Sequence, residues 1–214
     1  MIKRLFRIFL TGAALSAATL SQAEVTNSAG NGFTVQHQEL VAGNSEAVWK
    51  AIIAPSRYWN PDHSWTGKAE NLYLVPQAGG CFCELIRTVA GDNIKSSDGS
   101  VQHMRVIYAQ NNKMLRLSGA LGPLQSEAVT GTLTMELLPQ GASTVVRFTY
   151  KVGGYMEFPV EQIAPAVDVV IGEQLKRLSA LFAAEENSGA GPTDNSVPSE
   201  EDATIDPARD DGQN

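Results

Sequence analysis

The residues best suited to chemistry are a few histidines, cysteines and carboxylates. His63 follows Asp62 inside the aromatic stretch RYWNPDHSWTG, residues 57–67. A histidine with an ordinary pKa near ~6.5 could transfer a proton at neutral pH. Neighbouring side chains do not normally point the same way, however, and Asp62 could equally cap the loop that contains it. We therefore interpret the pair as structural and the stretch as the aromatic rim of a cavity.

A metal site is not expected. His37 and His103 lie in different predicted strands, and neither has a second histidine or a carboxylate at ligand-like spacing. A protein metal site needs three or four such ligands. The sequence also contains no pattern that indicates a cofactor.

Cys81 and Cys83 are the two cysteines of the chain and lie in one predicted strand. With a rise of about 3.3 Å per residue, their Cα atoms would be roughly 6.5 to 7 Å apart, at the limit for an unstrained disulfide. We expect two small apolar residues in the core. The alternative is a strained, redox-active disulfide, which requires a local bulge.

Glu84 alternates with these cysteines and shares a face with Phe82. On the inner face it would be desolvated, with a raised pKa, and could act as an acid, a base or a ligand anchor. On the outer face it would be a solvated surface residue. The strand pattern fits both arrangements, and we interpret the cysteines as the inward set.

The N-terminus has the pattern of a secretory signal. Three basic residues among the first seven precede an apolar run over 8–20, and the small-x-small sequence Ser-Gln-Ala ends at Ala23. The run is shorter than the ~20 residues that span a bilayer. We expect cleavage after Ala23 and a periplasmic or secreted protein without a stable membrane anchor.

The C-terminus, residues 185–214, holds nine acidic residues and one arginine. So little apolar surface cannot offset the entropy of ordering, which predicts a disordered acidic tail. Residues 24–184 carry 14 acidic and 12 basic residues. A nearly neutral domain has no basic surface for nucleic acid, and we expect no such partner.

The residues between the two ends predict a single α+β domain over 33–184, preceded by a polar spacer at 24–32. A strand at 33–41 is followed by a short helix capped by Asn44 or Ser45, and then by a helical turn at 56–59. Six further strand patterns follow, separated by turn signals. They cover approximately 69–75, 80–89, 100–109, 113–119, 128–138 and 143–152.

A long amphipathic helix closes the domain. Apolar residues recur at spacings of three and four from Val160 to Phe182. Pro159 suits its first turn, while Pro165 either kinks the helix or marks its true start. The expected architecture is a curved antiparallel sheet of about seven strands around this helix, with two short helices after the first strand.

Three stretches together resemble a known superfamily. They are SEAVWKAIIAPSRYWNP, GGCFCE and LGPLQSEAVTGTLTMELLPQGASTVVRFTYKVGGY, at 45–61, 79–84 and 121–155, followed by the closing helix. The combination is similar to the START-like or SRPBCC superfamily, and most similar to bacterial relatives of the ATPase-activator domain of a heat-shock-protein co-chaperone. The resemblance covers 33–184. It implies a helix-grip fold whose cavity, between sheet and helix, holds lipids, sterols, hormones or polyketides in various members.

We expect inward-facing sheet residues, the aromatic stretch and the closing helix to line this cavity. Glycines in the loop at 119–125 could let its mouth open. The candidate ligand-binding residues are Trp59, Trp65, Tyr73, Phe82, Glu84, Met104, Tyr108, Leu117, Met135, Phe148, Tyr150, Val167 and Ile171.

The leading functional hypothesis is a periplasmic protein that binds a small apolar or amphipathic molecule, such as a lipid, an isoprenoid or an aromatic metabolite. The alternative is a cyclase or hydratase that uses the same cavity, with His63, Glu84 or a tyrosine for proton transfer. A third possibility is a co-chaperone-like interaction module. The signal sequence argues against it, because the chaperone is cytosolic and driven by ATP.

Overall fold

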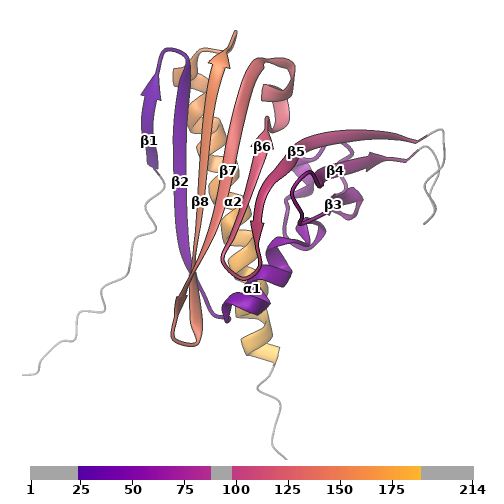
Figure 1. Cartoon of the computed structure of the whole chain (residues 1–214), viewed down its shortest axis with the longest axis vertical. Coiled ribbons are helices and arrows are strands. Elements are labelled where there is room, and N and C mark those ends of the chain that lie inside the picture. The colour runs from indigo at the N-terminus through magenta and orange to yellow at the C-terminus, as the bar shows by residue number, and fades with distance from the viewer. Residues whose placement is uncertain (1–23, 88–97, 189–214) are drawn as a thin grey trace, which may run out of the picture.

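Eight antiparallel strands form one sheet, and a long C-terminal helix lies against it (Figure 1). The computed structural model describes residues 24–87 and 98–188. The predicted signal sequence and most of the predicted tail therefore lie outside the described residues. The strand order is β1-β2-β8-β7-β6-β5-β4-β3. The strands are β1 (Glu24–Ala29), β2 (Gly32–Val41), β3 (Leu72–Leu74), β4 (Cys81–Ile86), β5 (Gly99–Gln110), β6 (Met114–Gly119), β7 (Ala128–Gln140) and β8 (Ser143–Tyr155).

Within the described residues, two α-helices and four short 3-10 turns complete the fold. They are α1 (Ser45–Ile52), α2 (Val160–Ser188), η1 (Pro55–Arg57), η2 (Pro61–His63), η3 (Ala69–Asn71) and η4 (Gly122–Ser126). Asn44 is the N-cap of α1, because its side chain accepts a hydrogen bond of 2.9 Å from the Ala47 N–H. The helical turn predicted at 56–59 is present as η1, which begins one residue earlier, and η2 follows it. No helix among the described residues is long and apolar enough to cross a membrane.

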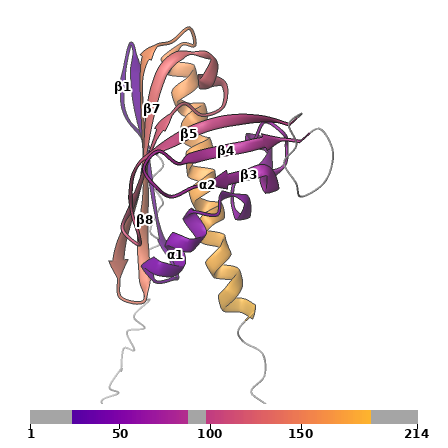
Figure 2. The same cartoon turned by 45° about the vertical axis from the view of Figure 1, so that its right-hand side comes forward.

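The sheet curls around α2 (Figure 2). Strands β7 and β8 alternate strictly, as predicted, with the side chains of Met135, Phe148 and Tyr150 fully buried. These residues belong to one core that also contains buried side chains of α1 and α2. The predicted α+β helix-grip fold is confirmed.

The boundaries differ from the prediction at both ends of the domain. Residues 24–29, expected to be a spacer, form β1, which pairs with β2 across the two-residue loop Gly30-Asn31. Such a loop is a hairpin signal that the sequence interpretation overlooked. At the other end, α2 starts at Val160, contains Pro165 and continues to Ser188, four residues into the predicted tail.

Strand β5 departs from strict alternation twice. Its pairing with β4 shifts at His103, and its pairing with β6 shifts at Ile107. Each extra residue in a bulge reverses the faces of the residues that follow. His103 and Met104 are therefore both buried, and Tyr108, which was predicted to face inward, is 42% exposed.

Helix α2 is tied to the sheet by a buried polar contact. His37 of β2, 4% exposed, lies 2.8 Å through Nε2 from Oδ1 of Asp168. Gly172 provides the space for this ring, because a Cβ there would lie 2.6 Å from Cε1 of His37. The contact fixes how α2 lies along β2, and α2 forms one wall of the site described next.

Candidate functional site

A cavity of about 370 Å³ lies between α2, the aromatic stretch and the segment that leads into η4. Most of the side chains around it are apolar. The lining residues are Trp59, Asp62, His63, Ser64, Trp65, His103, Leu121, Gly122, Pro123, Ile163, Ala166, Val167 and Val170. The cavity is large enough for a small organic molecule.

The two tryptophans of the aromatic stretch occupy different depths. Trp59 is 4% exposed, donates a hydrogen bond of 3.2 Å from Nε1 to the His63 carbonyl, and packs edge-on against Phe82 with ring centres 5.2 Å apart. Trp65 is 58% exposed, and its Nε1 donates to Oε1 of Gln125 at 3.0 Å. Trp59 thus forms part of the interior, whereas Trp65 joins the aromatic stretch to η4 at the cavity mouth.

Asn60 holds the aromatic stretch on α2. Its backbone N–H donates to Gln174 Oε1 at 2.8 Å, and its side-chain amide donates to Glu173 Oε1 at 2.6 Å. Its own Oδ1 accepts from the Asp62 N–H at 3.0 Å. The loop was expected to be capped by Asp62, and Asn60 has this role instead. Nε2 of His63 lies 3.0 Å from Glu173 Oε2 at an exposed position, consistent with a structural pair.

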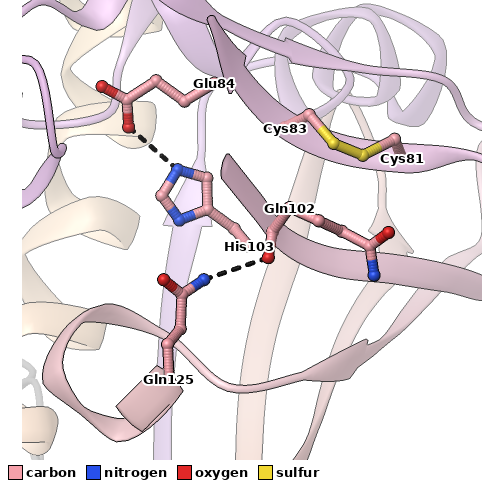
Figure 3. The surroundings of a disulfide bond; sticks show 6 residues. All are labelled: Cys81, Cys83, Glu84, Gln102, His103 and Gln125. Carbon is pink, nitrogen blue, oxygen red and sulfur yellow. Dashed lines mark hydrogen bonds and ion pairs between the residues drawn. A yellow bond between two sulfur atoms is a disulfide. The ribbon is translucent and has the colours of Figure 1, made fainter. Parts of the chain in front are cut away.

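Glu84 and His103 form a buried pair beside the cavity (Figure 3). Glu84 is fully buried, and its Oε2 lies 3.0 Å from Nε2 of His103. The same carboxylate accepts from the backbone N–H groups of Trp65 at 3.0 Å and Thr66 at 2.6 Å. Phe82 packs against the His103 ring, with centres 5.1 Å apart. Glu84 therefore lies on the inner face with Phe82, and the interpretation that placed only the cysteines inward was wrong.

The environment sets the charge of both members of this pair. Burial by itself raises the pKa of Glu84, but the hydrogen bonds from Thr66, from the Trp65 N–H and from His103 together outweigh it and leave the pKa below its ordinary value. Burial lowers the pKa of His103, and the attraction of Glu84 opposes this only in part. At neutral pH the pair therefore consists of a carboxylate and a neutral imidazole.

Cys81 and Cys83 form a disulfide, and no described cysteine is free. Their Cα atoms are 5.4 Å apart, closer than the spacing of an extended strand, which was the basis for expecting two thiols. The pairing of β4 with β5 shifts between Phe82 and Cys83. The extra residue at this shift is His103 of β5, opposite the cysteines. The expectation of unpaired cysteines was wrong.

The structure divides the predicted ligand-binding residues into three groups. Trp59, Trp65 and Val167 line the cavity. Tyr73 is 40% exposed, because it points away from buried Leu72 on the three-residue edge strand β3, and Tyr108 is exposed because of the bulge at Ile107. The remaining residues are buried in the core behind the cavity wall, namely Phe82, Glu84, Met104, Leu117, Met135, Phe148, Tyr150 and Ile171.

Core packing explains the position of this third group. Helix α1 and Tyr58 bury apolar side chains in the same core and occupy part of the space that the prediction left open. Tyr150 lies just beneath the wall, where its hydroxyl accepts a hydrogen bond of 3.2 Å from the Leu121 N–H. Burial raises its pKa. Tyr150 was predicted to bind the ligand, but its side chain is fully buried and its hydroxyl is bonded to the Leu121 N–H.

Sequence reasoning missed His103 as a wall residue. Strict alternation along β5 placed it outward, opposite to Met104. The segment at 119–125 was named only as a flexible mouth, yet Leu121, Gly122 and Pro123 line the cavity. One signal was available in the sequence, because a histidine and a carboxylate on adjacent antiparallel strands can pair across the sheet.

Comparisons with known proteins identify the fold but not a family. No protein-family model matches the chain, and no curated protein sequence matches it. A solved structure of an uncharacterised protein from Rhizobium leguminosarum is similar with a TM-score of 0.51 and 16% identity, over 72% of this chain and 95% of that one.

Two named proteins are similar at lower scores. CalU16 from Micromonospora echinospora has a TM-score of 0.46 and 13% identity, over 73% of this chain and 80% of that one. A point mutant of norcoclaurine synthase from Thalictrum flavum, solved with a transition-state analogue, has a TM-score of 0.48 and 15% identity, over 75% of this chain and 99% of that one. At these identities the similarities concern the fold alone.

Proposed function

We propose that the protein binds a small apolar or amphipathic molecule in the cavity between α2, the aromatic stretch and η4. The observation that carries the proposal is the cavity itself, with a volume of about 370 Å³ and walls formed mainly by side chains such as Trp59, Ile163, Val167 and Val170. Displacing water from such walls is favourable by roughly 25 cal/mol per Å² of buried apolar area.

The architecture also supports reversible binding. The mouth is bordered by exposed Trp65, whose contact with η4 is a hydrogen bond to Gln125. Gly122 in the adjacent wall has a φ of 54°, a left-handed conformation that favours glycine. We expect the segment at 119–125 to move when a ligand enters.

We further propose that the protein acts outside the cytoplasm. Two observations support this location: the signal-like pattern that ends at Ala23, and the disulfide between Cys81 and Cys83. Disulfides persist in the periplasm and outside the cell, and are rare in the reducing cytoplasm of most organisms. A binding protein in that location would carry or sequester apolar molecules that are poorly soluble in water.

The first experiment is to identify what the protein already holds. Protein purified from the cell envelope is extracted with organic solvent, and the extract is analysed by mass spectrometry. We expect one apolar compound in a stoichiometric amount. Protein that yields no compound and also fails to take up a fluorescent apolar probe would contradict the proposal.

A pair of variants on one helix tests the position of the site. Val167 lines the cavity, whereas Val169, two residues further along α2, is 68% exposed. Val167→Trp should fill the cavity and weaken binding of the apolar probe at least tenfold, because the bulky side chain occupies the ligand's volume. Val169→Trp adds the same side chain at the surface and should leave probe affinity unchanged. Equal affinities for the two variants would place the probe elsewhere.

A further inference from the structure

Among the described residues, the cavity wall contains one polar ring nitrogen that forms no hydrogen bond and keeps some accessible surface. Most polar side-chain groups around the cavity are already engaged: the indole N–H groups of Trp59 and Trp65 donate to protein oxygens, and so does the hydroxyl of Ser64. Asp62 and His63 are exposed to solvent. His103 differs from all of these, since it is 5% exposed and only one of its ring nitrogens is paired.

The pairing with Glu84 determines which nitrogen of His103 carries the hydrogen. A carboxylate only accepts hydrogen bonds, so Nε2 donates to Oε2 across 3.0 Å. In a neutral ring Nδ1 then has no hydrogen and can only accept. Figure 3 shows Nδ1 pointing away from Glu84, toward the side where Gln125 lies. Within residues 24–87 and 98–188, no hydrogen bond to Nδ1 is formed.

His103 lines the cavity, and its Nδ1 retains accessible surface. Among the described residues, no fully buried side-chain nitrogen or oxygen lacks a hydrogen-bond partner, so an unpaired Nδ1 must retain some accessible surface. His103 is itself one of the residues that line the cavity. Its orientation is fixed, because Glu84 is held by the N–H groups of Trp65 and Thr66 and the ring packs against Phe82. A preorganised acceptor of this kind binds a donor without losing rotational freedom.

The charge state leaves Nδ1 of His103 as a hydrogen-bond acceptor at neutral pH. Burial lowers the pKa of His103 and keeps its ring uncharged at neutral pH, while Glu84 stays ionised. A pure hydrocarbon would displace water from Nδ1 and leave the acceptor unpaired, which is unfavourable. A hydroxyl on the ligand would replace that water. An acidic hydroxyl, as in a phenol or an enol, is the strongest neutral donor for this purpose.

We infer that Nδ1 of His103 accepts a hydrogen bond from the ligand, and that the cavity therefore selects apolar molecules carrying a phenolic or enolic hydroxyl. This inference rests on the proposed function, because it assumes that the cavity is a ligand site. Glu84 is the positioning residue, and it acts by fixing the tautomer and the direction of the ring. The apolar walls provide most of the binding affinity, and the hydrogen bond to His103 determines which apolar ligands are preferred.

The test compares two probes that differ in a single donor, 2-naphthol and 2-methoxynaphthalene. Calorimetric titration at pH 7 should show that the wild-type protein binds 2-naphthol about two- to tenfold more tightly, as expected for one hydrogen bond. The variant His103→Phe keeps an aromatic ring but has no acceptor, and it should bind both probes equally. His103→Gln offers a carbonyl acceptor and should restore part of the preference.

A measurement on the wild-type protein covers the case in which His103→Phe does not fold. The ¹⁵N resonance of His103 Nδ1 should keep the position of a hydrogen-bonded acceptor when 2-naphthol binds, and should move downfield when 2-methoxynaphthalene displaces the water from Nδ1. Equal affinity of the wild type for both probes would overturn the inference and leave the proposed function standing. A preference that persists in His103→Phe would also overturn it. If neither probe binds, the proposed function itself fails.

Discussion

The buried pair of Glu84 and His103 makes the stability of the fold depend on pH. Burial keeps the pKa of His103 below the ordinary 6.5. For Glu84, hydrogen bonds outweigh burial and keep its pKa below 4.5. In both cases the unfolded chain binds a proton at a higher pH than the folded protein. The free energy of unfolding therefore falls as the pH is lowered, first through the His103 range and then through the Glu84 range.

We predict a two-step loss of stability on acidification. Urea unfolding measured from pH 8 to pH 3 should give a free energy of unfolding that declines from near pH 6.5 and declines again below pH 4.5. His103→Phe should lack its share of the first decline and keep the second, because the backbone N–H groups of Trp65 and Thr66 still bind the carboxylate. Identical pH profiles for variant and wild type would contradict this assignment.

At the scale of the element, the sequence interpretation was accurate where inward and outward residues alternate regularly along a strand. Strands β7 and β8 alternate without interruption, and their inward residues were predicted correctly. Strand β5 contains two bulges, and nothing in its residue types marks where the extra residues lie. His103 and Tyr108 were therefore assigned to the wrong faces. The disulfide was missed because its Cα atoms lie 5.4 Å apart, closer than the regular strand spacing on which the expectation was based.

The disulfide of β4 should contribute only modestly to stability. It joins residues two positions apart, so it closes a very short loop and removes little entropy from the unfolded chain. Reduction with dithiothreitol should lower the free energy of unfolding by about 1 to 2 kcal/mol. The double variant Cys81→Ala, Cys83→Ala should be insensitive to the reductant. If reduction lowered the free energy of unfolding by more than about 4 kcal/mol, the disulfide would have to stabilise packing beyond the short loop that it closes.

At the scale of the whole molecule, the fold could be predicted, whereas most of the cavity wall could not. Periodicities of two and of three to four residues indicate strands and a helix, and their order restricts the architecture to few arrangements. A cavity is instead the volume that three distant segments leave unfilled. Its position depends on how far side chains such as Tyr58 and Trp49 of the α1 region fill the concave face, which no local pattern encodes.

The proposed export leads to a prediction about the intact chain. Strand β1 begins at Glu24, directly after the predicted cleavage site, so removal of the signal sequence would cost none of the described strands. Intact-mass analysis of protein from the periplasm or medium should give a chain that starts at Glu24 and is two hydrogens lighter than the dithiol form. Full-length protein in the cytoplasm with two free thiols would contradict the proposed location.

The bulges of β5 also affect how relatives of this protein should be compared. An alignment that treats the strand as regular will place the inward residues of one protein in the same column as the outward residues of another. The alignment would be shifted by one residue from His103 onward and by a further residue from Ile107 onward. Substitution patterns at His103 would then appear to be those of a surface position. Searches for homologues that share the pair with Glu84 should therefore allow a single-residue gap at each bulge.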